Sequence, residues 1–254
     1  MDFQLKGRVA AITGASSGLG RRFALKLSEE GAAVAVMARR TDRLEALVEE
    51  IRARGGKAMT CALDVSQTAD IGPALDQVEA ELGPLSIMIN NAGVGGDGMA
   101  LEMSQEHFDN TFNVNVRGVY FGATEAARRM LKNGEAEAGR ARIINIASIA
   151  AFTQLPALSA YFASKAAVVS MTKALAREWA RRLISVNAIC PGYIETEINA
   201  DWFATEGGQR QIQTFPRRRL MDEDGLDAAL LMLAGAPGRQ ITGSAFTLDD
   251  GQLL

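Results

Sequence analysis

The chain contains 254 residues, of which 48% are hydrophobic and 22% are charged, and its formal net charge is −3. This length allows a large buried core, and we expect residues 1–254 to form one domain whose short, scattered basic clusters argue against nucleic-acid binding. Because the sequence has no apolar run of eighteen residues and no signal-peptide pattern, we expect a cytoplasmic protein with no membrane partner.

Strand-like and helix-like segments alternate regularly along the chain. Strands are predicted at 9–12, 34–38, 58–63, 85–89, 142–147 and 185–189, and helices at about 21–30, 44–54, 71–82, 107–131 and 161–182, with the fourth helix either continuous or broken near Gly118. The polar segment 132–141 is predicted to be an exposed connection. Such alternation is typical of an α/β protein with a doubly wound parallel sheet and helices on both faces.

A glycine-rich turn, TGASSGLG, joins the first predicted strand to the first helix. Gly14, Gly18 and Gly20 let backbone N–H groups approach a pyrophosphate with no Cβ in the way, and the helix N-terminus adds a favourable dipole. The spacing G-x-x-x-G-x-G differs from the common G-x-G-x-x-G, and a plain turn is the alternative interpretation. The turn therefore indicates a dinucleotide site only together with other motifs.

Tyr161 and Lys165 lie four residues apart in YFASK, and Ser148 precedes the tyrosine by thirteen positions in a strand-like run. Residues four apart on a helix share a face, so the ammonium can lie beside the phenol and lower its pKa. A serine hydroxyl beside the same phenol would stabilise an oxygen on which negative charge develops. These three residues indicate proton transfer to or from an oxygen.

Six motifs follow one another in the order, and at close to the spacing, found in the short-chain dehydrogenase/reductase family. The chain resembles this family over nearly its whole length, and ITGSAFTLDDG is similar to the family's last strand. The resemblance implies a single-domain Rossmann-like fold and an NAD(P)-dependent enzyme that interconverts a carbonyl and a secondary alcohol. The motifs are TGASSGLG at 13–20, NNAG at 90–93, Asn115 in FNVNVRG, Ser148, YFASK at 161–165 and PGYIET at 191–196.

The same resemblance implies a division of the catalytic work. Tyr161 is then the acid/base, Ser148 stabilises the substrate oxygen, and Lys165 lowers the pKa of the tyrosine and holds the nicotinamide ribose. Asn115 would hold a water in the proton relay; the alternative is a buried asparagine that bonds helix carbonyls near a kink.

Cofactor contacts are carried over in the same way. Asp64 would accept a hydrogen bond from the adenine amino group, with helix capping as its alternative, although Ser66 looks the better cap. Asn90, with Ala92 and Gly93, would belong to the segment after the fourth strand that shapes the cofactor pocket, and the alternative is a turn that stabilises the central sheet. The expected cofactor-binding residues are Gly14, Ser16, Ser17, Gly18, Leu19, Gly20, Arg39, Asp64, Val65, Asn91, Ala92, Gly93, Tyr161, Lys165, Pro191, Gly192, Ile194 and Thr196.

The end of the second predicted strand bears on the choice of cofactor. An acid at this place binds the ribose 2′-hydroxyl of NAD, whereas an arginine accommodates the 2′-phosphate of NADP. The strand here ends in Ala38, Arg39 and Arg40, and the first acid, Asp42, follows in the next helix. We therefore expect NADP(H) to be preferred and NAD(H) to remain possible, with Arg39 as the main phosphate contact and Ser16 as its helper. The alternative is a pair of exposed loop arginines.

The segment at about 193–220 mixes aromatic and polar residues, which is typical of a mobile lid over a substrate pocket. The alternative is an ordinary surface helix pair that packs these aromatics. The expected substrate is a small-molecule carbonyl or alcohol, such as a medium-sized apolar ketone, a 3-oxoacyl thioester or a steroid-like compound. Candidate pocket walls are Gly95, Met99, Ala150, Leu155, Tyr193 and Trp202.

The remaining reactive residues receive no chemical role. Cys61 and Cys190 are expected to be buried thiols, and His107, the single histidine, has no second metal ligand nearby, so we predict no metal site.

The family resemblance implies a homo-oligomer, a tetramer or dimer. A dinucleotide-binding redox sensor or interaction protein without catalysis is the main alternative function, and epimerisation or dehydration on the same scaffold is a third.

Overall fold

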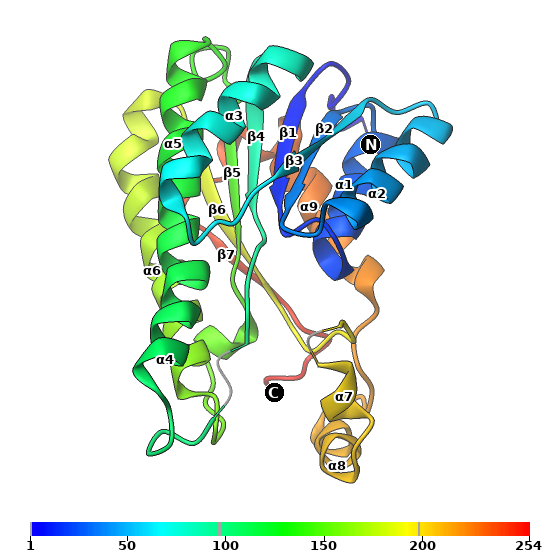
Figure 1. The fold of residues 1–254 in the computed structure, drawn as a ribbon, viewed down its shortest axis with the longest axis vertical. Coiled ribbons are helices and arrows are strands. Elements are labelled where there is room, and N and C mark those ends of the chain that lie inside the picture. Colours follow the sequence, from blue (N-terminus) through cyan, green and yellow to red (C-terminus); the bar gives the residue numbers. More distant parts are fainter. Residues whose placement is uncertain (1, 96–97, 198) are drawn as a thin grey trace.

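The computed structural model describes residues 2–95, 98–197 and 199–254. Seven parallel strands form one sheet in the order β3-β2-β1-β4-β5-β6-β7, which confirms the predicted doubly wound α/β fold (Figure 1). The strands are β1 (Val9–Thr13), β2 (Ala33–Ala38), β3 (Ala58–Ala62), β4 (Leu85–Asn90), β5 (Arg142–Ile146), β6 (Ser185–Pro191) and β7 (Ala245–Leu248).

Helices cover both faces of the sheet, and this explains why the central strands β1, β4, β5 and β6 are buried along their whole length. One face carries α1, α2 and α9, and the other carries α3, α5 and α6 (Figure 1). Phe23 of the first group and Leu75 of the second are fully buried, each in its own apolar core. The helices are α1 (Gly18–Glu29), α2 (Thr41–Ala53), α3 (Thr68–Leu82), α4 (Gln105–Phe112), α5 (Val119–Lys132), α6 (Ser159–Trp179), α7 (Ala200–Phe203), α8 (Glu206–Thr214) and α9 (Asp227–Ala234).

The long helix predicted at 107–131 is divided, and the break starts before Gly118. α4 ends at Phe112, a π-helical turn runs over Asn113–Gly118, and α5 continues from Val119. Short 3-10 helices lie at Ile149–Ala151, Ala180–Arg182, Glu223–Leu226 and Ala236–Gln240. No helix in the described part of the chain is long and apolar enough to cross a membrane.

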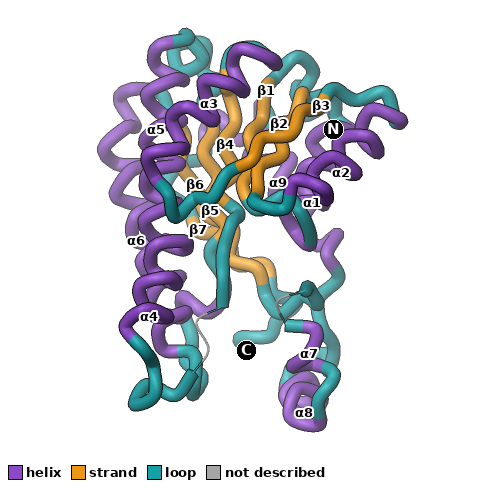
Figure 2. The backbone as a smooth tube through the Cα atoms, viewed as in Figure 1, coloured by secondary structure: helices purple, strands orange, loops and turns teal. Residues whose placement is uncertain are grey.

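The strand order reverses between β1 and β4, so the loops that follow these strands meet at the carboxyl edge of the sheet. Thr13 Oγ1 accepts hydrogen bonds from the backbone N–H groups of Asn91 and Ala92, each at 3.0 Å. A topological switch point of this kind is where open α/β sheets bind their ligands. Figure 2 shows α4, α7 and α8 lying beyond this same edge.

The connection 132–141 is not simply exposed, as predicted, because part of it packs inward. Glu135 and Ala136 are buried, and Glu135 forms an ion pair with Arg140. The backbone carbonyl of Arg140 in turn accepts a hydrogen bond from Arg8, a buried arginine at the start of β1. A buried guanidinium needs several acceptors, and the connection folds back to supply one of them.

A chain of buried polar side chains joins β4, β5 and α6 behind the carboxyl edge. Asn90 Nδ2 donates to Asn145 Oδ1 at 2.8 Å, and Asn145 Nδ2 donates to Thr172 Oγ1 at 2.9 Å. Asn145 and Thr172 are completely buried, and Asn90 nearly so. This chain ties the two central strands to the helix that carries Tyr161 and Lys165.

Asn145→Ala should lower the free energy of unfolding by about 2 kcal/mol, because it leaves the buried Asn90 amide without its acceptor. Urea denaturation followed by circular dichroism measures this change. Asn113→Ala is the matched control, since the half-buried Asn113 side chain forms no hydrogen bond with a described residue. Equal destabilisation by both substitutions would contradict the role given to the buried chain.

Candidate active site

The glycine-rich turn after β1 packs too closely for side chains at two of its glycines. A Cβ on Gly14, which has φ +67°, would lie 2.7 Å from Ala92 Cα, and a Cβ on Gly20 would lie 2.3 Å from the Gly14 carbonyl oxygen. Helix α1 starts at Gly18 within this turn, so its unpaired N–H groups face the same space. The close approach therefore places a helix N-terminus against the exit of β4.

A cavity of about 520 Å³ opens at this point. It extends from the glycine-rich turn to the exit of β4 and reaches the buried end of Lys165. Expected residues that line it are Gly14, Ser16, Ser17, Gly18, Leu19, Gly20, Arg39, Asp64, Val65, Asn91, Ala92, Gly93, Gly95, Lys165 and Thr196. It is also lined by Ala38, Arg40, Leu63, Val94, Val114, Ile146 and Glu197, which were not among the expected contacts.

Four expected cofactor residues do not line this cavity: Tyr161 on α6, and Pro191, Gly192 and Ile194 at the end of β6 and just after it. Pro191 ends the strand, and the Gly192 N–H donates to the Leu248 carbonyl oxygen at 2.8 Å. Ile194 is 4% exposed and pairs with Met221 in an isolated parallel bridge. Pro191, Gly192 and Ile194 fix the base of the segment 193–220.

Asp64 lines the cavity but does not cap a helix. Its Oδ1 accepts hydrogen bonds from the backbone N–H of Ser66 at 3.0 Å and from the Ser66 hydroxyl at 2.8 Å. The N-cap position of α3 belongs to Gln67, so the expectation that Ser66 or Asp64 would cap this helix is wrong. The short Asp64 side chain instead stabilises the turn after β3.

Ser148, Tyr161 and Lys165 come together from β5 and α6. Ser148 lies two residues after the buried end of β5, and its Oγ accepts a hydrogen bond from the Ala150 N–H at 3.1 Å. Lys165 is 5% exposed, and its Nζ donates to the Ile146 carbonyl oxygen at 3.0 Å. The same Nζ lies 5.6 Å from the centroid of the Tyr161 ring. A serine hydroxyl, a phenol and an ammonium thus come together, and the ammonium of Lys165 lines the cavity.

Asn115 lies in the π-helical turn, and its side chain fixes the backbone of Val94. Its Oδ1 accepts from the Val94 N–H at 2.8 Å, while its Nδ2 donates to the Val94 carbonyl oxygen at 2.9 Å and to the Ser164 hydroxyl at 3.0 Å. The side chain therefore does not bond helix carbonyls, as the alternative interpretation required. A Cβ placed on Gly93 would lie 3.4 Å from both Asn115 Oδ1 and Lys165 Nζ, so these two groups flank the same glycine.

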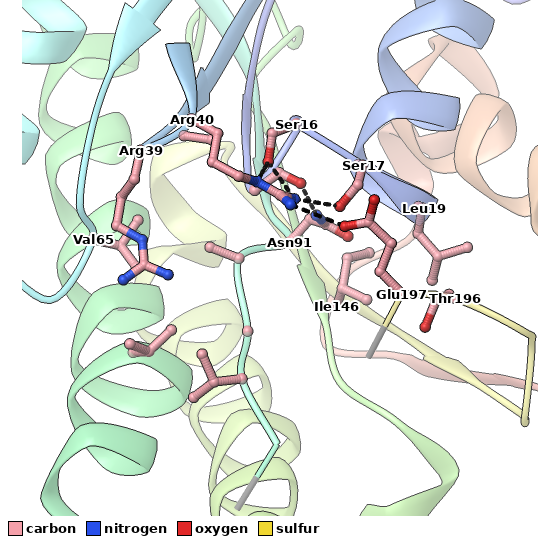
Figure 3. A pocket seen from close by; sticks show the side chains of 18 of the residues that line it. Ser16, Ser17, Leu19, Arg39, Arg40, Val65, Asn91, Ile146, Thr196 and Glu197 are labelled. Carbon is pink, nitrogen blue, oxygen red and sulfur yellow. Dashed lines mark hydrogen bonds and ion pairs between the residues drawn. The ribbon is translucent and has the colours of Figure 1, made fainter. Parts of the chain in front are cut away.

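The two arginines after β2 behave differently. Arg40 turns back to the glycine-rich turn, where it donates to the hydroxyls of Ser16 and Ser17, and it also pairs with Glu197 (Figure 3). Arg39 points away from this cluster, toward Val65, and forms no hydrogen bond or ion pair with a described residue (Figure 3). Arg39 and Arg40 both line the cavity, but the guanidinium group of Arg40 is already bonded to Ser16, Ser17 and Glu197.

The segment 193–220, described except at residue 198, contains α7 and α8 and has a small apolar core of its own. The ring of Tyr193 stacks on Phe215 with 5.4 Å between centroids and meets Phe203 edge-on at 5.8 Å. Trp202, which is half exposed, donates from Nε1 to Gln211 Oε1 at 2.7 Å. The packing matches the alternative of a surface helix pair, while the position beyond the carboxyl edge is that of the expected lid (Figure 2).

The other candidate pocket walls do not form one surface. Gly95 lines the cavity, and Ala150, two residues after Ser148, is buried. Leu155 and Met99 are exposed by 39% and 54% and do not line the cavity. His107 is exposed on α4, whereas Cys61 and Cys190 are buried free thiols, as expected.

Comparison with known proteins identifies the family. The family model for short chain dehydrogenases matches residues 8–207. The chain belongs to the short-chain dehydrogenase/reductase family. It is 34% identical over 253 residues to the D-threitol dehydrogenase of Mycolicibacterium smegmatis, an alignment that covers 100% of this chain and 95% of the relative.

Solved structures of the family superpose closely on this chain. A short-chain type dehydrogenase/reductase from Mycobacterium marinum has a TM-score of 0.91 and 38% identity, with 99% of this chain and 97% of that chain covered. The gluconate 5-dehydrogenase from Burkholderia cenocepacia J2315, in complex with NADP and tartrate, has a TM-score of 0.92, 31% identity and coverage of 99% and 97%. This dehydrogenase/reductase is therefore an NAD(P)-binding oxidoreductase that acts on alcohol or carbonyl groups.

The electrostatics of Tyr161 and Lys165 differ from the expectation in one respect. Burial raises the pKa of the Tyr161 phenol, and the hydrogen bond with Ser148 offsets only part of this shift. The expected lowering of this pKa by Lys165 is absent; burial instead lowers the pKa of the lysine itself to about 8. The ammonium is far enough inside the protein to lose its solvation, and its hydrogen bond goes to a backbone carbonyl rather than to the phenol.

We expect kcat/KM for carbonyl reduction by this dehydrogenase/reductase to fall as the pH rises through about 8, because Lys165 then loses its proton. Tyr161 remains protonated in this range, since its pKa is raised above the usual value. A pH–rate profile measures the alkaline limb. Lys165→Arg should remove the limb, because a guanidinium stays charged, whereas Lys173→Arg on the exposed side of α6 should retain it. Persistence of the limb in Lys165→Arg would contradict this assignment.

Proposed function

We propose that this dehydrogenase/reductase prefers NADP(H) and interconverts a carbonyl compound and a secondary alcohol, with Tyr161 as the acid/base. The observation that supports this most directly is the meeting of Ser148 and Tyr161 with Lys165, whose buried ammonium reaches the cavity at the glycine-rich turn. The phenol of Tyr161 can then donate a proton to a substrate that also lies beside a dinucleotide bound in the cavity.

The residues at the turn fit a dinucleotide. Gly14 and Gly20 leave no room for a Cβ, so the bare backbone and the N-terminus of α1 face the cavity. Backbone N–H groups and a helix dipole are favourable partners for a pyrophosphate. Asp64 and Val65 line the adjoining part of the cavity, where the adenine would bind, and Thr196 lines its opposite wall.

The chemistry divides between the cofactor and this chain's own residues. A bound nicotinamide supplies the hydride. In the reductive direction Tyr161 donates its phenol proton to the substrate oxygen, and the Ser148 hydroxyl donates a hydrogen bond to the same oxygen as charge develops. The raised pKa of Tyr161 keeps the phenol protonated at neutral pH, which suits a proton donor. Lys165 would hold the nicotinamide ribose, and Asn115 would hold the relay water.

Three features favour NADP(H) over NAD(H). β2 ends at Ala38, so no carboxylate at the strand end repels a 2′-phosphate. Arg39 lines the cavity and has no protein partner among the described residues, so its guanidinium is available to a phosphate. The similar gluconate 5-dehydrogenase was solved in complex with NADP.

The substrate would bind between the catalytic residues and the segment 193–220. Ala150 lies two residues after Ser148, and Tyr193 lies two residues after the end of β6. Gly95 lines the cavity itself, and these three residues would form walls of the substrate pocket. We propose a medium-sized carbonyl compound, such as an apolar ketone, a 3-oxoacyl thioester or a steroid-like molecule. A panel of ketones, acyl thioesters, sugars and sterols with NADPH distinguishes these classes.

We also propose that the enzyme is a homo-oligomer, a dimer or tetramer. Tyr120 and Phe121 on α5 and Phe108 on α4 expose 41%, 36% and 42% of their surfaces. Exposed large aromatic side chains on neighbouring helices of one chain are suited to packing against a second copy. Light scattering in solution measures the assembly.

Tyr161→Phe should abolish turnover, with a loss of at least about 10²-fold, while the dissociation constant for NADPH stays nearly unchanged. Nicotinamide absorbance measures turnover, and fluorescence titration measures binding. Tyr120→Phe removes the same hydroxyl from an exposed tyrosine on α5 that does not line the cavity, and it should keep full activity. Survival of turnover in Tyr161→Phe would refute the proposed mechanism.

Arg39→Ala should weaken NADPH binding by about ten- to a hundredfold, the value of one charge-assisted contact to a phosphate, and leave NADH binding unchanged. Both dissociation constants are measured by the same titration. Arg52→Ala removes an equal charge from the exposed face of α2 and is the control. Equal loss of affinity for the two cofactors would show that Arg39 does not read the 2′-phosphate.

A further inference from the structure

A bridge of ion pairs lies across one side of the cavity. Arg40 Nη1 is 3.0 Å from Glu197 Oε2, and Arg43 Nη1 pairs with the other carboxylate oxygen, Oε1. The same Arg40 guanidinium donates to the Ser16 hydroxyl at 3.0 Å and the Ser17 hydroxyl at 2.8 Å (Figure 3). We call Glu197 with Arg40 and Arg43 the Glu197 bridge.

The bridge joins three segments that are far apart in sequence. Arg40 and Arg43 lie at the start of α2, the two serines belong to the glycine-rich turn, and Glu197 comes from the loop between β6 and α7. The N-terminus of α2 adds a favourable dipole for a negative group. A carboxylate from the substrate side of the protein therefore occupies a set of donors that would suit a phosphate.

The charge on Glu197 persists at every physiological pH. Its two arginine partners, Arg43 first and Arg40 second, lower the pKa of its carboxyl to about 2. Protonation therefore does not open the bridge under ordinary conditions. A competing anion that binds the same arginines is required instead.

We propose that Glu197 is a specificity-determining residue that competes with the phosphate groups of the dinucleotide for Arg40 and Arg43. This inference rests on the proposed use of NADP(H). It goes beyond that proposal by naming Glu197 as a residue that limits the affinity of the protein for the 2′-phosphate of the cofactor. Arg39 binds the phosphate without competition, whereas Arg40 contributes only after its ion pair with Glu197 has broken. The unsubstituted protein therefore binds NADPH less tightly than it would if Arg39, Arg40 and Arg43 were all free to bind the phosphate.

The exposure of the bridge makes this exchange feasible. The side chains of Arg40 and Arg43 are each 44% exposed, and that of Glu197 is 50% exposed. Exposed ion pairs are weak and screened by salt, so a doubly charged phosphate can displace a single carboxylate. Removal of the carboxylate also removes a negative charge that would repel the incoming phosphate.

Glu197→Gln should tighten NADPH binding by about three- to tenfold, the effect of releasing two exposed ion pairs, and change NADH binding less than twofold. Isothermal titration calorimetry on the full chain measures both constants, and 2′,5′-ADP against 5′-AMP tests the phosphate alone. Glu195→Gln is the matched control, because Glu195 is exposed two residues away, forms no ion pair with a described residue and changes the net charge equally. The gain for Glu197→Gln should shrink as the salt concentration rises.

Two results would overturn the inference. Weaker NADPH binding by Glu197→Gln would mean that Glu197 orients Arg40 for the phosphate rather than competing with it, and equal constants for Glu197→Gln and Glu195→Gln would remove its role altogether. A failure of the proposed function has a different signature, since the unsubstituted protein would then bind NADH at least as tightly as NADPH, or bind neither cofactor.

Discussion

The close approach of β1 and β4 at their carboxyl ends is the contact on which the rest of the site depends. The hydroxyl oxygen of Thr13 accepts hydrogen bonds from two backbone N–H groups of the segment after β4. In return, Asn91 Nδ2 donates hydrogen bonds to the carbonyl oxygens of Thr13 and Gly14. These bonds hold two loops so close that Gly14 has no space for a side chain. The cavity, the N-terminus of α1 and the position of Gly93 beside Lys165 all follow from this distance.

Buried positive charge has two different uses at the two edges of the sheet. At the amino edge, Arg8 donates to the backbone oxygens of Ala234, Ser86 and Arg140, and burial lowers the pKa of its guanidinium only to about 10. At the carboxyl edge, Lys165 has one backbone acceptor, and burial lowers its pKa to about 8. Burial shifts both groups downward to a similar extent, and because the ordinary pKa of lysine lies below that of arginine, only Lys165 is brought close to neutral pH, where chemistry can use its proton.

Local patterns in the sequence were sufficient for the architecture and for the centre of the site. Apolar runs gave the strands, because parallel strands covered on both faces are apolar throughout, and the glycine spacing and YFASK are contiguous motifs. The π-helical turn at 113–118 could not be predicted, since its cause is the contact of Asn115 with Val94, which only the folded chain creates. Burial of Glu135 depends in the same way on the arginines at the amino edge.

The Glu197 bridge was beyond the reach of sequence analysis for a related reason. Arg40 and Glu197 are separated by 157 positions, and neither residue stands in a pattern that indicates its partner. The raised pKa of Tyr161 was also missed, because a helical spacing of four shows that Lys165 can lie near the phenol but not how deeply both groups are buried. Long-range pairs and burial are properties of the packed molecule.

The separate apolar core of the segment 193–220 has a consequence for how such an enzyme changes over evolution. Phe203, Ile212 and Phe215 pack with one another and with Tyr193, and not into the two cores that support the sheet. Mutations in α7 and α8 can therefore accumulate without loosening strand β5 and helix α6, which position Ser148, Tyr161 and Lys165. New substrate preferences can arise in this segment while the reaction chemistry is inherited intact, and a directed-evolution library confined to it would sample specificity at little risk to folding.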